Sequence, residues 1–335
     1  MKPVIFGIAG RALNAEERAF FRDADPLGYI LFKRNCGDRA QMRALTDSLR
    51  ELSGRADVPI LIDQEGGRVS RMQPPEWPEF PAGAAFDALY EVGPISAIEA
   101  ARANGQALAM MLADVGVNVN CAPLLDVRQP EVTPAIGDRA FGGEPMRVAA
   151  LGQAMLEGMR RGGVVGVVKH MPGHGRALVD SHYALPRVSA DAAALEIDIE
   201  PFARLNDAPM AMTCHVVFDA WDAERPATLS PTVISEIIRG RIGFDGLLMT
   251  DDIDMKALSG TAGEKAAQSL AAGCDVVLDC WARMDEMVEI AGLIGEATPE
   301  CRARLDRAMA SVAGGPEAVD AAALLAKRDE LLKLA

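Results

Sequence analysis

Residues 164–170 read VVGVVKH, an apolar run that ends abruptly in a lysine and a histidine. Such a run is typical of a buried strand. The loop that follows, MPGHGRALVDSH at residues 171–182, holds two more of the chain's four histidines. Histidine is the side chain that exchanges protons most readily near neutral pH. A rigid strand that leads into such a loop therefore indicates the floor of a catalytic site.

Seven more short apolar runs lie along the chain, and most are separated by longer amphipathic stretches. Strands that alternate with helices predict a parallel sheet, and eight of them predict a (β/α)8 TIM barrel of the α/β class. An open doubly wound sheet is the alternative, but polar residues follow several runs, as they do at the catalytic face of a barrel. The eight expected strands are Val4–Ala9, Gly28–Lys33, Val58–Asp63, Val117–Pro123, Val164–His170, Pro209–His215, Gly246–Thr250 and Asp275–Asp279.

Helical segments are expected between most of these strands. Asn14–Arg22 begins with a capping asparagine that precedes two glutamates, which is a favourable helix start. A charged amphipathic helix is expected at about residues 318–335, packed outside the barrel. Because no linker or internal repeat interrupts the pattern, we expect a single domain over residues 1–335. The other expected helices are Ala97–Val115, Met146–Arg161, Ala190–Arg204 and Pro231–Arg241.

The composition narrows the range of partners. The chain carries 34 Lys and Arg against 48 Asp and Glu, a net charge of −14, which argues against nucleic acid and anionic membranes as partners. No apolar run approaches the roughly 18 residues that cross a bilayer, and no secretory signal is visible. The six cysteines show no CxxC or metal-binding spacing. These features predict a cytoplasmic protein. We also expect a small-molecule substrate and a monomer.

The loop 169–182 admits three interpretations. His170 and His174 have the spacing of metal ligands on a helix, but the Pro-Gly pair between them opposes that helix. The polar residues could instead pack structurally. Proton transfer and substrate binding fit best, because Asp180 and His182 project to one side if the loop is extended. The carboxylate would then raise the pKa of the imidazole, so that the imidazole donates and later accepts a proton.

A second candidate segment, DQEGGRVSR at residues 63–71, begins where an apolar strand ends. Its glycine pair permits an unusual turn, and its acids precede the glycines, unlike a dinucleotide fingerprint. Asp63 and Arg71 either bind a polyhydroxylated ligand or pair with one another. Arg139 follows Asp138 in the loop after the fourth expected strand, and it either contacts ligand or belongs to a surface ion pair.

Asp251 and Asp252 end the seventh expected strand. Adjacent residues of a strand point to opposite sides, so one carboxylate is expected to face the barrel axis while the other supports it or caps the next helix. A carboxylate at such a strand end is a candidate nucleophile or electrostatic stabiliser. His215 follows another strand and is either a polar rim residue or a ligand contact.

Together these motifs resemble those of glycoside hydrolase family 3, above all its beta-N-acetylhexosaminidase branch, which acts in cytoplasmic peptidoglycan recycling. The resemblance covers roughly residues 4–300. The histidine motif followed by Asp-Ser-His is specific to this branch, whereas beta-glucosidases of the family take their acid from a second domain. The matching stretches are KHMPGHG at 169–175, DSH at 180–182, TDD at 250–252, DQEGGRV at 63–69, YILFKRN at 29–35, NCAPLLDV at 120–127 and MTCH at 212–215.

The resemblance implies a role for each candidate residue. Asp251 would be the nucleophile that forms a covalent glycosyl-enzyme, and His182, paired with Asp180, would be the general acid/base. The family needs no metal and no cofactor for this reaction. The N-acetylglucosamine unit would be bound by Asp63, Arg71, Arg139, Lys169 and His170, with His174, His215 and Asp252 in supporting positions.

The implied activity is that of a retaining exo-beta-N-acetylglucosaminidase acting on GlcNAc-beta-1,4-anhydro-MurNAc, with or without a stem peptide. Three alternatives are a family 3 phosphorylase, a metal-dependent barrel hydrolase that uses the clustered histidines, and an inactive sugar-binding protein. The last is disfavoured because both Asp251 and His182 are present. The chain departs from the family pattern at Met171, where Phe is usual, and at 253–255 (IDM), where Leu-Ser-Met is common.

Overall fold

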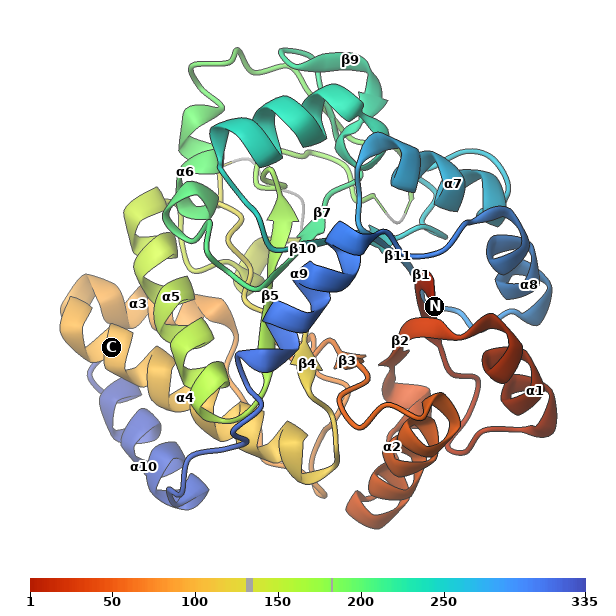
Figure 1. Cartoon of the computed structure of the whole chain (residues 1–335). Helices are drawn as coiled ribbons and strands as arrows, with labels where there is room; N and C mark the ends of the chain where they lie inside the picture. The colour runs from red at the N-terminus through yellow and green to blue at the C-terminus, as the bar shows by residue number, and fades with distance from the viewer. Residues whose placement is uncertain (131–134, 182) are drawn as a thin grey trace.

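In the computed structural model, which describes residues 1–130, 135–181 and 183–335, eight parallel strands close into a barrel (Figure 1). Neighbouring strands follow chain order, and the pairing of the last strand with the first closes the ring. The barrel prediction is confirmed, and the open-sheet alternative is wrong. The strands are β1 (Lys2–Gly7), β2 (Pro26–Leu31), β3 (Ile60–Ile62), β4 (Val119–Asn120), β5 (Val165–Met171), β7 (Met210–Thr213), β10 (Leu247–Asp252) and β11 (Val276–Asp279).

Apolar side chains from the strands fill the barrel. Val165, Val167 and Met210 belong to this interior cluster and are at most 1% exposed. Helix α9 (Pro299–Ala310) lies across the amino ends of the strands (Figure 1) and adds Cys301 to the same cluster. Because α9 closes the amino end, the polar residues at the carboxyl ends of the strands lie on the opposite face of the molecule.

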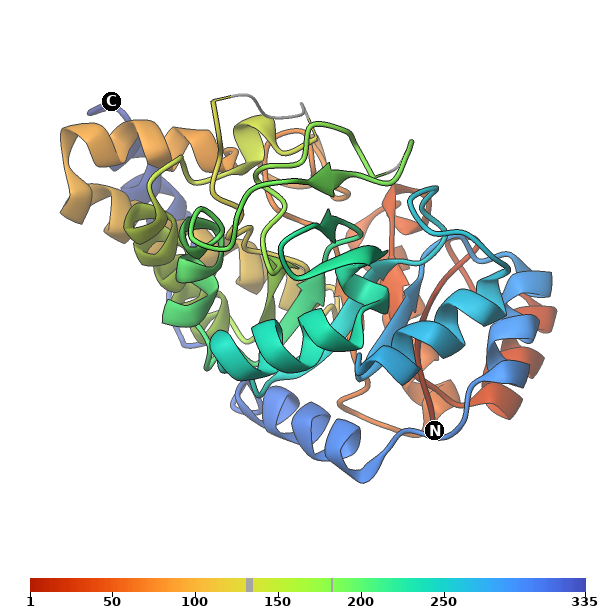
Figure 2. The same ribbon diagram turned by 90° about the horizontal axis from the view of Figure 1, so that it is seen from above.

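Helices surround the barrel (Figure 2) and pack their apolar faces against the outer side of the strands. The expected capping residue Asn14 caps α1 in a capping box with Glu17. The helices are α1 (Ala15–Ala24), α2 (Arg39–Ser53), α3 (Gly83–Val92), α4 (Pro94–Asp114), α5 (Pro145–Arg161), α6 (Glu196–Arg204), the π-helical segment Val233–Arg241, α7 (Ala262–Ala272), α8 (Met284–Leu293), α9 and α10 (Ala321–Leu332).

The structure differs from the expectations at two places. The helix expected over Ala190–Arg204 begins only at Glu196, because Asp191 accepts a hydrogen bond from the Ala194 N–H and forms a turn there. A small sheet was not foreseen. It joins β6 (Arg187–Val188), β8 (Val217–Phe218) and β9 (Asp222–Pro226). Its strands are too short to show a period of two in the sequence.

Helix α10 packs on the outside of the barrel beside α4 and α3 (Figure 1). Its Arg328 is 6% exposed, donates to Asn104 Oδ1 at 3.1 Å, and lies over the Phe80 ring. Phe80 in turn accepts a hydrogen bond from the Gly67 N–H through its carbonyl oxygen. The last helix therefore braces the loop that follows β3. Within the described ranges, no helix is long and apolar enough to cross a membrane.

Candidate active site

A cavity of about 580 Å³ opens at the carboxyl ends of the strands, within the roughly 300–1,000 Å³ typical of small-molecule sites. His215 is fully buried beside it, and His182 lies outside the described residues. The other residues predicted from the sequence all line the cavity. They are Asp63, Arg71, Arg139, Lys169, His170, His174, Asp180, Asp251 and Asp252.

Lys169, near the end of β5, joins two carboxylates from the β3 side of the cavity. Its Nζ lies 3.1 Å from Asp63 Oδ1 and 2.8 Å from Glu65 Oε1. Arg71 adds a bond of 3.1 Å to Asp63 Oδ2. Burial alone would raise the pKa of Asp63, but attraction to Lys169 and Arg71 outweighs it and holds that pKa well below its usual range. The pairing suggested for Asp63 and Arg71 is thus observed, and paired side chains at a cavity wall can still bind hydroxyl groups.

Arg139 forms a bidentate pair with Glu65, from Nε to Oε2 at 2.8 Å and from Nη2 to Oε1 at 2.7 Å. The surface pair expected with Asp138 does not form, because Asp138 binds Arg68 instead. Burial would raise the pKa of Glu65, but Lys169 and Arg139 lower it to about 2. Glu65 is therefore a fixed anion that places two cations at the cavity wall.

Asp126 positions the two histidines of the 169–175 motif. Its Oδ2 lies 2.7 Å from His170 Nδ1, and its Oδ1 accepts from the His174 backbone N–H at 2.7 Å. Burial opposes ionisation, yet the nearby His170 and these hydrogen bonds lower the pKa of Asp126 to about 2. In the described part of the chain the other ring nitrogen of His170 has no partner, so the ring can offer it to a ligand. His174 is buried, and burial lowers its pKa to about 4.

Asp251 lies next to the end of β10 and lines the cavity, and its surroundings favour the ionised carboxylate. Burial would raise its pKa, but attraction to His170 and His215 and a backbone hydrogen bond from Asp252 lower it. That bond, from the Asp252 N–H to Asp251 Oδ1, is 2.8 Å long. A carboxylate that stays charged and reaches a cavity is suited to nucleophilic attack or to stabilising positive charge.

Asp252 does not cap the next helix, whose N-cap is Thr261. Its carboxylate accepts from the Trp281 indole N–H at 3.1 Å and from the Asp254 N–H at 3.2 Å. Burial raises the pKa of Asp252 to about 7. His215 Nε2 donates to the Asp252 carbonyl oxygen at 2.9 Å. His215 thus supports the backbone of the aspartate pair and does not line the cavity.

The loop after β5 brings Asp180 and Ser181 to the same cavity as Asp251. The Ser181 carbonyl oxygen accepts from the Ala257 N–H at 3.2 Å, so this loop contacts the loop that follows β10. Of the predicted proton-transfer pair, the structure describes only the carboxylate, Asp180. Its partner His182 lies outside the described residues.

Three residues that line the cavity or hold its lining residues in place were not assigned a role from the sequence. Glu65 stands two positions after Asp63, and an extended backbone projects such residues to one side, so the sequence contained a usable signal. Asp126 lies in a matching motif, but its partners, His170 and His174, come from β5 and the loop that follows it. Trp281 follows the last strand, and no feature of the sequence singled it out.

A metal-dependent reaction would need a cluster of ligands. Among the described residues, no group of three or more His, Cys, Asp or Glu side chains is arranged to hold a metal ion. The rings of His170 and His174 meet edge to face, with centroids 5.8 Å apart. The metal-site interpretation also used His182, which lies outside the described residues, so that interpretation stays untested.

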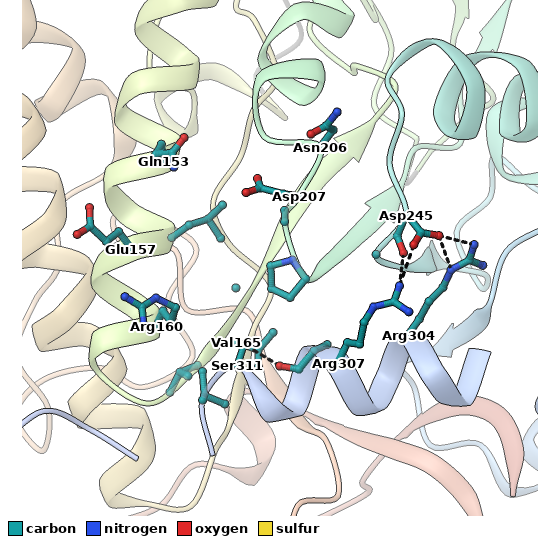
Figure 3. A pocket seen from close by; sticks show the side chains of 18 residues that line it. Gln153, Glu157, Arg160, Val165, Asn206, Asp207, Asp245, Arg304, Arg307 and Ser311 are labelled. Atoms are coloured by element: carbon teal, nitrogen blue, oxygen red, sulfur yellow. Dashed lines mark hydrogen bonds and ion pairs between the residues drawn. The ribbon is translucent and has the colours of Figure 1, made fainter. Parts of the chain in front are cut away.

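A second cavity, of about 530 Å³, lies at the opposite end of the barrel (Figure 3). It is lined by the starts of β5, β7 and β10 and by α9. Figure 3 shows Arg304 and Arg307 of α9 turned toward Asp245, with which both form ion pairs. Asp180 and Asp251, the two described residues that were predicted to be catalytic, line the cavity at the carboxyl ends and not this one.

Sequence comparison places the chain among carbohydrate-active enzymes. The profile of the glycosyl hydrolase (glycoside hydrolase) family 3 N-terminal domain matches residues 6–313. A curated beta-hexosaminidase of Chromobacterium violaceum is 38% identical over 334 residues, which covers 98% of this chain and 91% of the relative. A beta-hexosaminidase of Alkalilimnicola ehrlichii is 39% identical over 83% of this chain and 80% of its own.

Solved structures give the same grouping. Native NagZ from Neisseria gonorrhoeae has a TM-score of 0.87 at 30% identity and covers 100% of this chain and 98% of its own. The same protein in complex with N-trifluoroacetyl-D-glucosamine has a TM-score of 0.86 at 30% identity, over 99% and 98% of the two chains.

Proposed function

Because the chain belongs to glycosyl hydrolase family 3 and is a beta-hexosaminidase, we propose that it is a retaining exo-beta-N-acetylglucosaminidase. The observation that carries this proposal is Asp251, a half-buried carboxylate that lines the cavity and whose pKa is lowered by its surroundings. Its charge state is the one that a nucleophile or an oxocarbenium-stabilising group needs.

The first step forms a bond between an Asp251 carboxylate oxygen and the anomeric carbon, while the bond from that carbon to the leaving oxygen breaks. His182 gives its proton to the leaving oxygen, and Asp180 stabilises the imidazolium beforehand. In the second step His182 takes a proton from water, whose oxygen attacks the anomeric carbon and releases Asp251. A His–Asp pair here takes the place of the second carboxylate.

Sugar binding falls to the charged wall formed by Asp63, Arg71, Arg139, Lys169 and His170. Lys169 and Arg139 are held by Glu65 and need little reorganisation when a ligand enters. His170, oriented by Asp126, presents its free ring nitrogen. This wall fits the many hydroxyl groups and the acetamido group of N-acetylglucosamine. The NagZ relative bound to a glucosamine derivative supports this ligand class.

The proposed substrate is GlcNAc-beta-1,4-anhydro-MurNAc, with or without its peptide, which places the enzyme in cell-wall recycling. Family resemblance supports this choice. Release of N-acetylglucosamine from the purified muropeptide, followed by chromatography, tests it. Turnover of simple N-acetylglucosaminides without any turnover of the muropeptide would contradict it.

The nucleophile assignment is tested with a 2-acetamido-5-fluoro sugar fluoride that forms a slowly hydrolysed intermediate. Peptide mapping by mass spectrometry should find the label on Asp251. The Asp251→Asn variant, treated in parallel, should remain unlabelled. A label on any other residue refutes the assignment.

The acid/base assignment is tested with two leaving groups. The His182→Ala variant should lose far more activity on a disaccharide than on an activated aryl glycoside, because the latter needs little help from an acid. Equal losses on both substrates would contradict the role. Loss of activity with a chelator, restored by zinc, would favour the metal-dependent alternative, and acceleration by phosphate would favour the phosphorylase.

A further inference from the structure

Trp281 is an exposed aromatic residue at the mouth of the active-site cavity. It is 57% exposed and lines the cavity, whereas Trp77 is only 5% exposed and Trp221 packs against Phe218. Single exposed apolar residues are normal on protein surfaces. This one differs because it borders the pocket that contains Asp251.

The backbone and ring of Trp281 are held in place. The indole N–H donates to Asp252 Oδ2 at 3.1 Å, and Arg34 donates to the preceding carbonyl oxygen, that of Cys280. The next residue, Ala282, has a φ of 58°, a left-handed conformation that non-glycine residues seldom adopt. An exposed ring that is held through its own N–H, on a backbone held by Arg34, is preorganised to contact something other than this chain.

Trp281 lies across the cavity from the sugar-binding wall. In the barrel order, β11 stands opposite β4, the strand whose following loop carries Arg139 (Figure 1). The neighbour of β11 in the barrel is β10, and the loop after β10 contacts the proposed acid/base loop through the hydrogen bond from the Ala257 N–H to the Ser181 carbonyl oxygen. Asp180 and Ser181 of that loop line the same cavity as Trp281, so a leaving group protonated from this loop would lie toward the side of the mouth where Trp281 stands.

From this placement we propose that Trp281 is the platform on which the leaving-group sugar rests, which makes it a specificity-determining residue. The C–H bonds on one face of a pyranose ring form an apolar surface that packs on an aromatic ring, and Trp offers the largest such surface. This inference rests on the proposed function and deepens it. The enzyme selects aglycones that contain a sugar ring over aglycones that lack one.

The test compares N,N′-diacetylchitobiose with N-acetylglucosaminyl fluoride, whose leaving group has no ring. Trp281→Ala should lower the ratio of kcat/KM for the two substrates about tenfold, as loss of a Trp anchor does. Trp281→Phe keeps a ring but loses the bond to Asp252, and should hold the ratio within about threefold. Val288→Ala, at a 52% exposed apolar residue of α8, is the matched control and should leave both rates unchanged.

A binding measurement gives an independent readout. Chitobiose added to Asp251→Asn should change the tryptophan fluorescence, and the change should disappear when Trp281→Phe is added. Equal losses of Trp281→Ala on both substrates would overturn the proposal, because they would mean that Trp281 acts only through Asp252. No loss on either substrate would also overturn it. A wild-type enzyme that hydrolyses neither substrate would instead refute the proposed function, and the platform with it.

Discussion

Two arcs of the barrel mouth contain carboxylates, and the pKa values of these carboxylates are shifted in opposite directions. The cationic arc consists of Asp63, Glu65, Arg139 and Lys169 around β3, β4 and β5. Its carboxylates are ion-paired, and the pKa of each is lowered. The acidic arc consists of Asp252 and Asp279, at the ends of β10 and β11. Burial raises the pKa of these two to about 7 and about 8.

Burial alone therefore does not decide the charge of an aspartate. Within the described residues, no Lys or Arg forms an ion pair with Asp252 or Asp279, so the desolvation penalty stays uncompensated there. Asp251 lies next to the acidic arc, at the end of the same strand as Asp252. Its pKa is nevertheless lowered, by attraction to His170 and His215, by the Asp252 N–H and, more weakly, by Lys169 of the cationic arc. The proposed nucleophile therefore depends on groups across the cavity for its lowered pKa.

The largest effect is expected for Asp251→Asn. An amide cannot form the glycosyl ester, so kcat should fall by roughly 10⁴-fold, the size seen when a central catalytic carboxylate is removed. Hydrolysis of N-acetylglucosaminyl fluoride measures the loss, and thermal unfolding confirms that the variant is folded. A loss below tenfold would show that the ionised state of Asp251 serves another purpose.

Lys169→Met should remove the two ion pairs that Lys169 forms in the cationic arc. It leaves Asp63 and Glu65 buried without their shared cation, so the free energy of unfolding should fall by about 3–5 kcal/mol. Urea unfolding at pH 7 measures this. Lys256→Met is the matched control, because Lys256 borders the same cavity but is exposed and unpaired among the described residues, and its change should stay below about 0.5 kcal/mol. Equal changes in both variants would mean that the pairing contributes nothing.

The same variant changes the response to acid. The folded pKa of Glu65, about 2, lies below its unfolded value, so its ionisation contributes stability above the unfolded pKa that is lost as the pH falls toward 2. In Lys169→Met this acid-dependent loss should be smaller, because the lowered pKa depends on the removed cation.

The acidic arc predicts the opposite dependence on pH. Asp279 is 1% exposed, and its Oδ2 has no hydrogen-bond partner among the described residues. Its folded pKa of about 8 lies above the unfolded value, so the folded state binds more protons and stability falls as the pH rises between about 4 and 8. Asp279→Asn removes the charge and should stabilise the protein at pH 9 by about 1–2 kcal/mol, with little effect at pH 4.

Thermal unfolding at the two pH values checks this expectation. Asp306→Asn, at an exposed position of α9, is the control and should change stability equally little at both pH values. If Asp279→Asn destabilises the protein at pH 9, the buried carboxylate must be stabilised as an anion, and the contrast between the two arcs would be wrong.

The sequence predicted the barrel well because its strands are buried on both faces and read as continuous apolar runs, as at 164–168. It also predicted most of the residues that line the cavity, since the carboxyl ends of parallel strands meet there, but His215 lies behind the cavity wall and His182 lies outside the described residues. It could not predict partners. Glu65, rather than Asp138, binds Arg139 because closure of the barrel brings their loops together. The raised pKa of Asp252 likewise depends on burial beneath the loop after β11.

The smallest expected effect on the free energy of unfolding is that of Asp138→Asn. Asp138 and Arg139 are neighbours in the sequence, but they belong to an exposed and a buried ion pair. Arg68 and Asp138 are 46% and 50% exposed, whereas Arg139 and Glu65 are 14% and 7% exposed, although the pairs are 2.9 and 2.7 Å long. Solvent screens the first pair, so Asp138→Asn should cost less than about 0.5 kcal/mol. Glu65→Gln should cost about 3 kcal/mol or more, because it leaves two buried cations short of a counter-charge. Urea unfolding of both variants measures the difference. Similar losses would mean that the length of an ion pair, and not its burial, determines its contribution at this barrel mouth.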